Sequence, residues 1–333
     1  MNTKYDVVGI GNAIVDVIAS VPEGFLTEHN IRKGGMTLVN QFEANELARA
    51  FGQLGRRVSG GSGANTIAGV TSFGGKTGYI GKVTDDALGK FFRKDMERVQ
   101  IDFNTEPLTG DKVPGTARCM IAVTPDGERS MSTFLGSSTE FTSLDIDVDM
   151  IESAKILYLE GYLFDKEAAK RAFVQSAAIA QKANRKVALT LSDSFCVDRH
   201  RVAFRHLIKN HVDLLFANES ELLSLYETDD FDQAITALRA EATTAAVTRS
   251  EKGSVVITPN EIVPMQAEPV AKVVDATGAG DQYAAGFLYG FARNRRIRDC
   301  AKLGHIAAAE VISHYGPRPE KSYHQLAVRA GLL

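Results

Sequence analysis

The segment Val273-Val274-Asp275-Ala276-Thr277-Gly278-Ala279-Gly280-Asp281 is expected to hold the end of a strand followed by a glycine loop. Tyr283, Phe287 and Phe291 follow at intervals of four residues, which predicts a helix that begins near Ala279 and buries one face. A helix start that follows such a loop presents free backbone N–H groups and a positive dipole end. The segment therefore predicts an α/β fold with an anion site at the start of this helix.

Apolar runs and helical patterns alternate along the rest of the 333 residues. This alternation predicts an α/β fold with a mostly parallel sheet that is covered by helices on both faces. Strands are expected at Tyr5–Ile10, Lys76–Val83, Ala154–Leu159, Val187–Leu191, Leu214–Ala217 and Ala245–Thr248. Helices are expected at Asp85–Val99 and near residues 166–183, 199–209 and 219–226.

Two stretches break this alternation. Thr116–Phe134 is expected to be a hairpin around the turn Pro125-Asp126-Gly127, and residues 14 to 40 look extended. We expect residues 14–40 and 112–135 to form a small β lid that excludes water from the site. The large domain is then expected to comprise residues 1–13, 41–111 and 136–333. A hairpin without a role in the site is the alternative.

Composition narrows the classes of partner. The formal charge of −3, without a basic block, argues against nucleic acid, and no apolar run approaches the ~20 residues that span a membrane. The N-terminus lacks the pattern of a signal peptide. Three cysteines that lie far apart suit a reducing cytoplasm, and each is expected to be a small buried side chain.

Asp281 is the first candidate for chemistry. It falls in the first helical turn beside the expected anion site, where a carboxylate can accept a proton from a hydroxyl that attacks a bound phosphoryl group. The alternative is that Asp281 only complements the helix dipole. The preceding glycine loop favours the role of base.

Three further motifs point to hydroxyl or metal binding. Gly9-Ile10-Gly11-Asn12-Ala13-Ile14-Val15-Asp16 lacks the third glycine and the following helix of a dinucleotide fingerprint, so its amide and carboxylate suit vicinal hydroxyls better. In Gly60-Gly61-Ser62-Gly63-Ala64-Asn65-Thr66, Asn65 is either a hydroxyl ligand or a helix cap. Asn218 and Glu221 end a strand and can form a capping box, a magnesium motif, or both.

In order along the whole chain, these motifs resemble those of the ribokinase-like (PfkB) family of sugar and purine kinases. The family signature D-T-x-G-A-G-D keeps Gly278–Asp281 here, while Asp275-Ala276-Thr277 replaces its usual opening. The resemblance implies a ribokinase-like three-layer α/β/α domain with a small β-sheet lid, and ATP as phosphoryl donor. It also implies that Asp281 is the base, and that the amides of Gly278, Ala279 and Gly280 form the anion hole.

The same resemblance assigns roles to the other motifs. It places Asn12, Asp16, Gly61 and Asn65 at the substrate hydroxyls, and it has Asn218 and Glu221 order the water shell of Mg²⁺. Thr248-Arg249-Ser250-Glu251-Lys252-Gly253 matches the nucleotide loop T-x-G-x-x-G, with Ser250 in place of the first glycine. Thr248 and Gly253 therefore remain the expected ATP contacts of this loop.

The C-terminal run, with His305 in Gly304–Ile312 and then Pro319-Glu320-Lys321, resembles the family members that phosphorylate adenosine. That match implies that His305 flanks the ATP base, that Arg129 reaches the phosphates, and that Met131 and Thr133 contact the nucleoside. Met36, Leu38, Met131 and Tyr162 are expected to form an apolar slot for a purine or, alternatively, to pack the core of the lid. A monovalent cation such as K⁺ is expected at Asp275 and Thr277, with carbonyl ligands at Val311, His314 and Gly316.

The expected reaction is adenosine plus MgATP giving AMP and ADP. A sugar such as ribose or fructose is the alternative acceptor, and a catalytically silent regulator that binds nucleosides or sugars is the alternative of another class. The lid is compatible with a monomer or with a homodimer joined through two lids.

Overall fold

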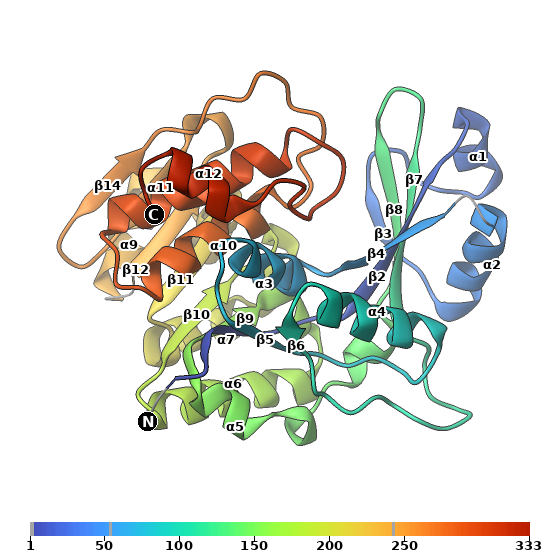
Figure 1. Cartoon of the computed structure of the whole chain (residues 1–333), viewed down its shortest axis with the longest axis horizontal. Coiled ribbons are helices and arrows are strands. Elements are labelled where there is room, and N and C mark those ends of the chain that lie inside the picture. Colours follow the sequence, from blue (N-terminus) through green and yellow to red (C-terminus); the bar gives the residue numbers. More distant parts are fainter. Residues whose placement is uncertain (1–2, 53–54, 242–243) are drawn as a thin grey trace.

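The computed structural model describes residues 3–52, 55–241 and 244–333, and it holds two β-sheets with helices packed on them (Figure 1). Met1 and Asn2, at the N-terminus considered above, lie outside the described residues. The larger sheet has nine strands in the order β14-β13-β12-β11-β10-β9-β1-β5-β6. Its strands are β1 (Tyr5–Ile10), β5 (Thr77–Ile80), β6 (Ile101–Asp102), β9 (Ala154–Glu160), β10 (Lys186–Thr190), β11 (Leu214–Asn218), β12 (Thr244–Thr248), β13 (Ser254–Ile257) and β14 (Ile262–Met265).

The larger sheet is parallel from β6 to β12 and antiparallel at β13 and β14, which confirms the predicted α/β fold with a mostly parallel sheet. Along β1, Val8 and Ile10 pack into one core and Val7 packs into the other, as the period of two requires. One face carries α5 (Val148–Glu152), α6 (Glu167–Lys182), α7 (Ser194–His211), α8 (Glu219–Tyr226) and α9 (Phe231–Ala240). The other carries α3 (Ser62–Ser72), α4 (Ala87–Arg98), α10 (Ala279–Phe291) and α11 (Ile297–Val311), with α12 (Tyr323–Arg329) beyond them.

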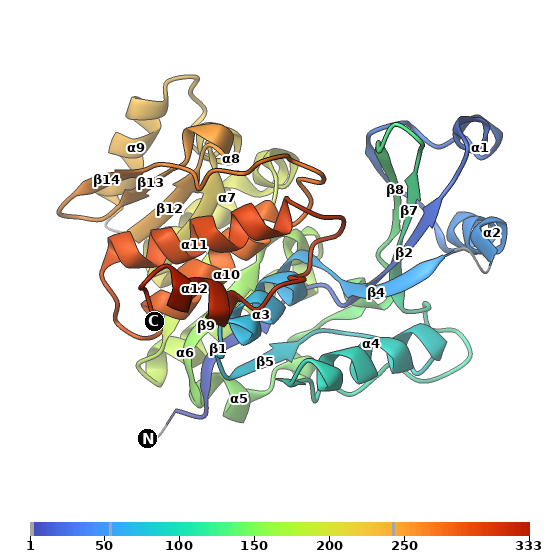
Figure 2. The ribbon, with the colours of Figure 1, turned by 45° about the horizontal axis from the view of Figure 1, so that its top comes forward.

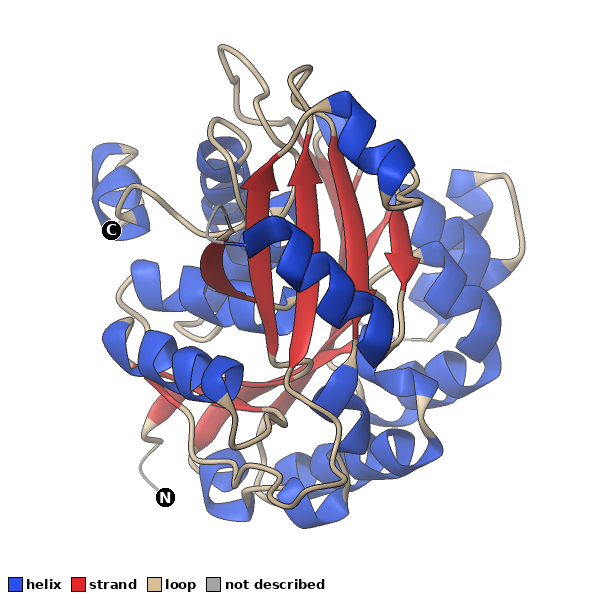
Figure 3. Cartoon of the chain, turned by 90° about the vertical axis from the view of Figure 1, so that its right-hand side faces the viewer, coloured by secondary structure: helices blue, strands red, loops and turns tan. Residues whose placement is uncertain are grey.

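The smaller sheet has five strands in the order β3-β8-β7-β2-β4 and stands beside the larger one (Figures 1 and 2). Its outer face is covered by two helices, and Figure 3 views this side, with helices lying across the strands. Leu26, Leu47 and Phe51 of these helices pack against Met120 and Ala122 in a core of their own. The elements are β2 (Ile14–Ser20), α1 (Glu23–Glu28), β3 (Met36–Leu38), α2 (Gln41–Phe51), β4 (Arg56–Gly60), β7 (Ala117–Val123) and β8 (Arg129–Phe134).

The predicted hairpin is present as β7 and β8, but two expectations about the small sheet were wrong. Residues 14–40 are not extended throughout, because α1 interrupts them and β3 has three residues. The predicted boundary at residue 41 also fails, since α2 packs on this sheet and β4 pairs with β2. Four of the five residues of β4 are polar or glycine, as suits an edge strand whose first two residues are exposed, and this composition hides the strand in the sequence.

In the part of the chain that the structure describes, no helix is both long and apolar enough to cross a bilayer. Cys119, Cys196 and Cys300 are each buried.

Candidate active site

The expectation of a strand at Val273-Val274 was wrong, because these residues lie in irregular backbone outside both sheets and Val273 is exposed. The glycine loop that follows ends at Gly278, whose φ of 80° lies in the left-handed region. No side chain caps α10, and no described residue accepts a hydrogen bond from the N–H of Gly280 or Asp281. A Cβ at Gly278 would come within 2.7 Å of Pro317 Cα, whereas a Cβ at Gly280 would meet no atom within 4 Å. Gly278 is thus needed by the backbone, and Gly280 leaves open space beside two free donors.

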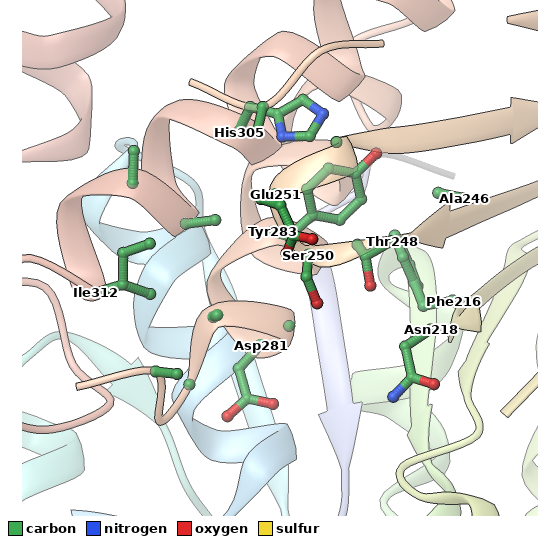
Figure 4. A pocket seen from close by; sticks show the side chains of 18 of the residues that line it. Phe216, Asn218, Ala246, Thr248, Ser250, Glu251, Asp281, Tyr283, His305 and Ile312 are labelled. Atoms are coloured by element: carbon green, nitrogen blue, oxygen red, sulfur yellow. The ribbon is translucent and has the colours of Figure 1, made fainter. Parts of the chain in front are cut away.

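A pocket of about 840 Å³ opens at this helix start (Figure 4). It lies at the carboxyl ends of β11 and β12, which is the edge where open α/β sheets bind ligands. Its volume is within the range of nucleotide-sized sites. The predicted site residues that line it are Asn218, Glu221, Thr248, Gly253, Gly278, Ala279, Gly280, Asp281 and His305.

The carboxylate of Asp281 is held at both oxygens. Ser62 Oγ donates to Oδ1 at 2.6 Å, and Asn65 Nδ2 donates to Oδ2 at 3.2 Å. Burial raises the pKa of Asp281, while these two hydrogen bonds and the charge of Arg318 oppose the rise. A carboxylate has about four acceptor positions, so Asp281 can still accept a proton from a ligand hydroxyl.

Asp16 projects from β2 without a partner. It is 8% exposed, and its carboxylate accepts no hydrogen bond from a described residue. Burial raises the pKa of Asp16 to about 7; Arg129 and Arg318 counteract this effect, and the charge of Asp281 adds to it. A buried carboxylate without a donor is costly, which makes Asp16 a strong acceptor for ligand hydroxyls.

Glu160, which no motif pointed to, fixes the neighbouring loop. Its Oε1 accepts from Asn12 Nδ2 at 2.7 Å and its Oε2 from the N–H of Gly63 at 2.8 Å. One N–H of the Asn12 side chain is therefore engaged, and Oδ1 and the second N–H are left for a ligand. Gly61 has a φ of 91°, and a Cβ there would lie 2.3 Å from the carbonyl oxygen of Asn12.

Asn65 differs from the expectation that it contacts substrate. Its Nδ2 bonds Asp281, and its Oδ1 accepts from Arg318 Nε at 2.8 Å. Both ends of the amide are thus engaged by protein groups, because α3 brings Asn65 next to the first turn of α10. Arg318 was also not predicted, since it belongs to no motif.

Strand register shows which side chains share the inner face of the small sheet, opposite α1 and α2. Met131 lies beside Met36, and Thr133 lies beside Leu38 and Cys119. Cys119 in turn lies beside Asp16. The residues predicted to form the apolar slot on the small sheet therefore share one face with Asp16, and Met36 and Leu38 are 49% and 56% exposed.

Tyr162 lies just after β9, a strand of the larger sheet, whereas Met36, Leu38 and Met131 lie on the small sheet. Its N–H donates to Ser192 Oγ at 3.1 Å. Burial raises its pKa, and the charges of Asp193, Glu221 and Asp281 add to this effect. Its ring is thus near the floor of the pocket.

Arg129 forms an ion pair with Asp275, and its predicted contact with the phosphates stays a prediction. Its Nε and Nη2 are buried without a partner among the described residues. Asp275 also accepts from the N–H of Gly316 at 2.8 Å and from Thr277 Oγ1 at 2.6 Å. Burial opposes the effect, but these bonds and Arg129 lower the pKa of Asp275.

The residues expected at a monovalent cation are therefore partly assembled. Asp275, Thr277 and Gly316 lie together, but protein donors occupy both oxygens of Asp275. Val311 is buried at the end of α11, and His314 Nε2 lies 3.2 Å from Glu310 Oε2. A cation here would therefore depend on backbone carbonyls and on Thr277 Oγ1, which donates to Asp275 but can still act as a ligand.

Asn218 and Glu221 form the predicted capping box. Asn218 Oδ1 accepts from the N–H of Glu221 at 2.8 Å, and Glu221 Oε2 accepts from the N–H of Asn218 at 3.0 Å. Burial raises the pKa of Glu221 to about 7, and the charges of Asp193 and Asp281 add to the rise. No group of three or more described His, Cys, Asp or Glu side chains could hold a metal directly. An acidic pocket without such a cluster fits Mg²⁺ that keeps its waters and binds phosphate.

The far end of the pocket carries the nucleotide loop. Ser250, which replaces a family glycine, has a φ of 52°, and Gly253 has a φ of 85° with its Cβ position 2.0 Å from Met265 O. His305 Nε2 lies 2.9 Å from Ser254 Oγ, and burial lowers the pKa of His305 to about 4. His305 is therefore neutral at pH 7, and it flanks the pocket as predicted (Figure 4).

A family profile described as pfkB family carbohydrate kinase matches residues 39–322. The chain belongs to this family. It is therefore a kinase, and membership of this family implies the use of ATP, normally with Mg²⁺.

Solved structures of similar proteins agree in fold. The adenosine kinase from Sinorhizobium meliloti is 48% identical, with a TM-score of 0.90 and coverage of 98% of this chain and 99% of that one. A probable sugar kinase protein from Rhizobium etli CFN 42 is 44% identical, with a TM-score of 0.91 and coverage of 99% and 100%. The adenosine kinase of Saccharomyces cerevisiae is 25% identical over 329 residues, which is 92% of this chain and 95% of that protein.

Proposed function

We propose that this kinase transfers the γ-phosphoryl group of ATP to the 5′-hydroxyl of adenosine, giving AMP and ADP. The observation that carries the proposal is the position of the Asp16 carboxylate, which lies against Gly60, two residues before the Ser62 that bonds Asp281. Asp16 is a buried carboxylate without a donor, and it is close enough for the charge of Asp281 to raise its pKa. Vicinal ribose hydroxyls bound at Asp16 would bring the 5′-hydroxyl toward Asp281. The similarity to the S. meliloti adenosine kinase supports this acceptor.

The proposed mechanism uses Asp281 as general base. The 5′-hydroxyl proton passes to its carboxylate as the hydroxyl oxygen bonds the γ-phosphorus, and the bond to the β,γ-bridging oxygen breaks to release ADP. Ser62 and Asn65 hold the carboxylate in place during this step. The free N–H groups of Gly280 and Asp281 would stabilise the charge on the transferred group.

Arg129 would supply further donors to that charge. Its Nε and Nη2 are buried and unpartnered, so an anion that entered beside it would satisfy both. The small sheet that carries Arg129 would act as the lid that excludes water. Mg²⁺, when bound, would neutralise phosphate charge; Asn218 and Glu221 would hold its waters. We further propose that K⁺ lies at Asp275 and Thr277 with the carbonyls of Val311, His314 and Gly316.

Selection of a purine is proposed to come from the apolar inner face of the lid. Met36 and Met131 lie side by side there, and Leu38 follows on the same strand as Met36. A flat base would cover these exposed side chains, whereas a free sugar would leave them in water. On the opposite side, Thr248, Gly253 and His305 would contact ATP.

A panel of acceptors tests the proposal. ADP release is measured with MgATP and adenosine, guanosine, inosine, ribose or fructose. We expect kcat/KM for adenosine to exceed that for either sugar by about 100-fold or more, because only the nucleoside buries the base. Preference for ribose or fructose would replace the nucleoside with a sugar, as the name of the R. etli protein suggests. Adenosine binding without ADP release would overturn the proposal.

A further inference from the structure

Arg318 lies in the loop between α11 and α12, outside every motif used above. Its side chain bridges two elements of the site. Nε donates to Asn65 Oδ1 at 2.8 Å, and Nη2 donates to Ser59 Oγ at 3.2 Å. Its charge also acts on Asp16 and Asp281.

The loop that carries Arg318 is anchored at its base. Gln282, which is fully buried, donates through Nε2 to the carbonyls of Pro317 at 2.8 Å and Asn65 at 3.0 Å. Gly278 packs directly against Pro317 on the other side. The backbone next to Arg318 is thereby tied to α3, to α10 and to the glycine loop, so the guanidinium has a defined position.

This position decides how the Asn65 amide is turned. A guanidinium only donates, so the atom of Asn65 that faces Arg318 must be the carbonyl oxygen. The NH₂ group then points the other way, to Asp281 Oδ2 at 3.2 Å. With Ser62 on Oδ1, both oxygens of Asp281 are oriented.

We propose that Arg318 is a positioning residue for the general base, and that it acts through Asn65 to fix the orientation of the Asp281 carboxylate. The inference rests on the proposed role of Asp281. Asn65 is thereby assigned to the base rather than to the acceptor. Without Arg318 the amide is free to flip, and its oxygen would then face the carboxylate and repel it.

The charges around Asp281 give the proposal a second consequence. Asp16 on β2, Glu160 on β9 and Glu221 on α8 interact unfavourably with its negative charge. Arg318 is a cation that counteracts them, and its loss should make Asp281 harder to ionise. The acid limb of kcat should then move to higher pH.

The test compares Arg318→Met, Arg318→Lys, Asn65→Ala and the double variant Arg318→Met/Asn65→Ala with Arg296→Gln. Arg296 has an exposed side chain that pairs with Asp299 in the first turn of α11, so it is the matched control. Activity is measured with whichever acceptor the unaltered kinase phosphorylates, so the result does not depend on adenosine being that acceptor. ATP binding and thermal unfolding are measured on every variant to separate misfolding from misplacement.

We expect Arg318→Met to lower kcat by about 10- to 100-fold with an unchanged KM for ATP, and to shift the acid limb upward. Arg318→Lys should keep the limb in place, because it keeps the charge, yet lose part of kcat. At a pH above the acid limb, where loss of the Arg318 charge no longer limits turnover, the double variant should be little worse than Asn65→Ala alone, because Arg318 acts through Asn65.

Additive losses in the double variant, or an unshifted acid limb in Arg318→Met with ATP binding intact, would overturn the proposal. If Arg318→Met fails to fold, Arg318→Lys and Asn65→Ala still decide it through the loss of kcat and the position of the limb. Inactivity of the unaltered kinase toward every acceptor would instead count against the proposed function.

Discussion

The glycine loop at the start of α10 and the inner face of the small sheet are built in opposite ways. The loop offers backbone N–H groups, and its one reactive side chain, Asp281, is held by two neighbours. The small sheet offers groups that have no partner among the described residues, namely the Asp16 carboxylate and the Nε and Nη2 of Arg129, together with the exposed Met36 and Leu38. The glycine loop therefore carries the chemistry that any acceptor needs, and the small sheet carries the recognition of a particular acceptor.

The largest effect is expected when the loop loses its base. Asp281→Asn keeps the shape and the hydrogen bond from Ser62 but cannot take a proton, so kcat should fall by about 10²- to 10⁴-fold. Single-turnover kinetics, with nucleoside and ATP binding measured by calorimetry, check that binding survives. Full turnover in this variant would remove Asp281 from the chemistry and dissolve the contrast between the two regions.

Asp16→Asn is the matching change in the small sheet. An amide replaces an acceptor pair that no protein donor satisfies, so KM for the acceptor should rise by about 10- to 100-fold with little change in KM for ATP. Steady-state kinetics with each substrate varied in turn separate the two constants. A loss confined to kcat would assign Asp16 to the chemistry as well.

Acidity should distinguish the two regions further. Because the pKa of Asp16 is raised to about 7, kcat/KM for the acceptor should fall roughly fivefold between pH 7 and pH 6 as this carboxylate is protonated. In the folded protein Asp16 holds its proton between its unfolded pKa and about 7, so stability decreases as pH rises through that window. Asp16→Asn should therefore flatten the acid limb of kcat/KM for the acceptor. It should also raise Tm at pH 8. An unchanged limb would place the titration elsewhere.

Two glycines of the loop form a matched pair. Gly278→Ala imposes a left-handed alanine and a contact with Pro317, so it should lower the free energy of unfolding by roughly 1–3 kcal/mol. Gly280→Ala meets no atom, so Tm should hold while KM for ATP rises by about tenfold, because the methyl group fills the space beside the free N–H groups. Denaturant unfolding and kinetics together separate them. Equal loss of stability in both would contradict the open space at Gly280.

The smallest effect is expected at Ser250. Its φ of 52° costs little in an exposed loop, so Ser250→Gly should raise stability by about 1 kcal/mol or less and Tm by about 2 °C or less. Gln100 is also exposed and has a φ of 62°, so Gln100→Gly is the control for the relief of backbone strain alone. A lower KM for ATP in Ser250→Gly, without one in Gln100→Gly, would show that the serine hinders the nucleotide.

The same contrast explains which parts of the fold and of the site could be predicted from the sequence. The loop was predictable because a left-handed backbone at Gly278 and close approach at Gly280 both demand glycine, and Asp281 follows within one turn. The parallel sheet was predictable from its apolar strands. β4 was hidden by its polar composition, which an edge strand tolerates.

Glu160 and Arg318 could not be found in this way. Glu160 meets Asn12 across 148 positions of sequence, and Arg318 meets Asn65 across 253. Such contacts depend on how α3, β9 and the loop after α11 pack, and no local period or motif records that packing. For the same reason the sequence does not show that the Asn65 amide bonds Asp281 and Arg318, and its contact with substrate stays a prediction.

The separate core of the small sheet has a mechanical consequence. Leu26, Leu47 and Phe51 pack the small sheet and its two helices together as one unit. Among the described residues, the chain passes from one sheet to the other four times, after β1, β4, β6 and β8. Gly61 and Gly136, which lie at two of these passages, have positive φ angles. Rotation of the small sheet and its helices about these connecting segments would let Arg129 leave Asp275 for another partner, and every strand would stay intact. The rate of opening would then be set by rotation at these connecting segments and not by the refolding of a strand.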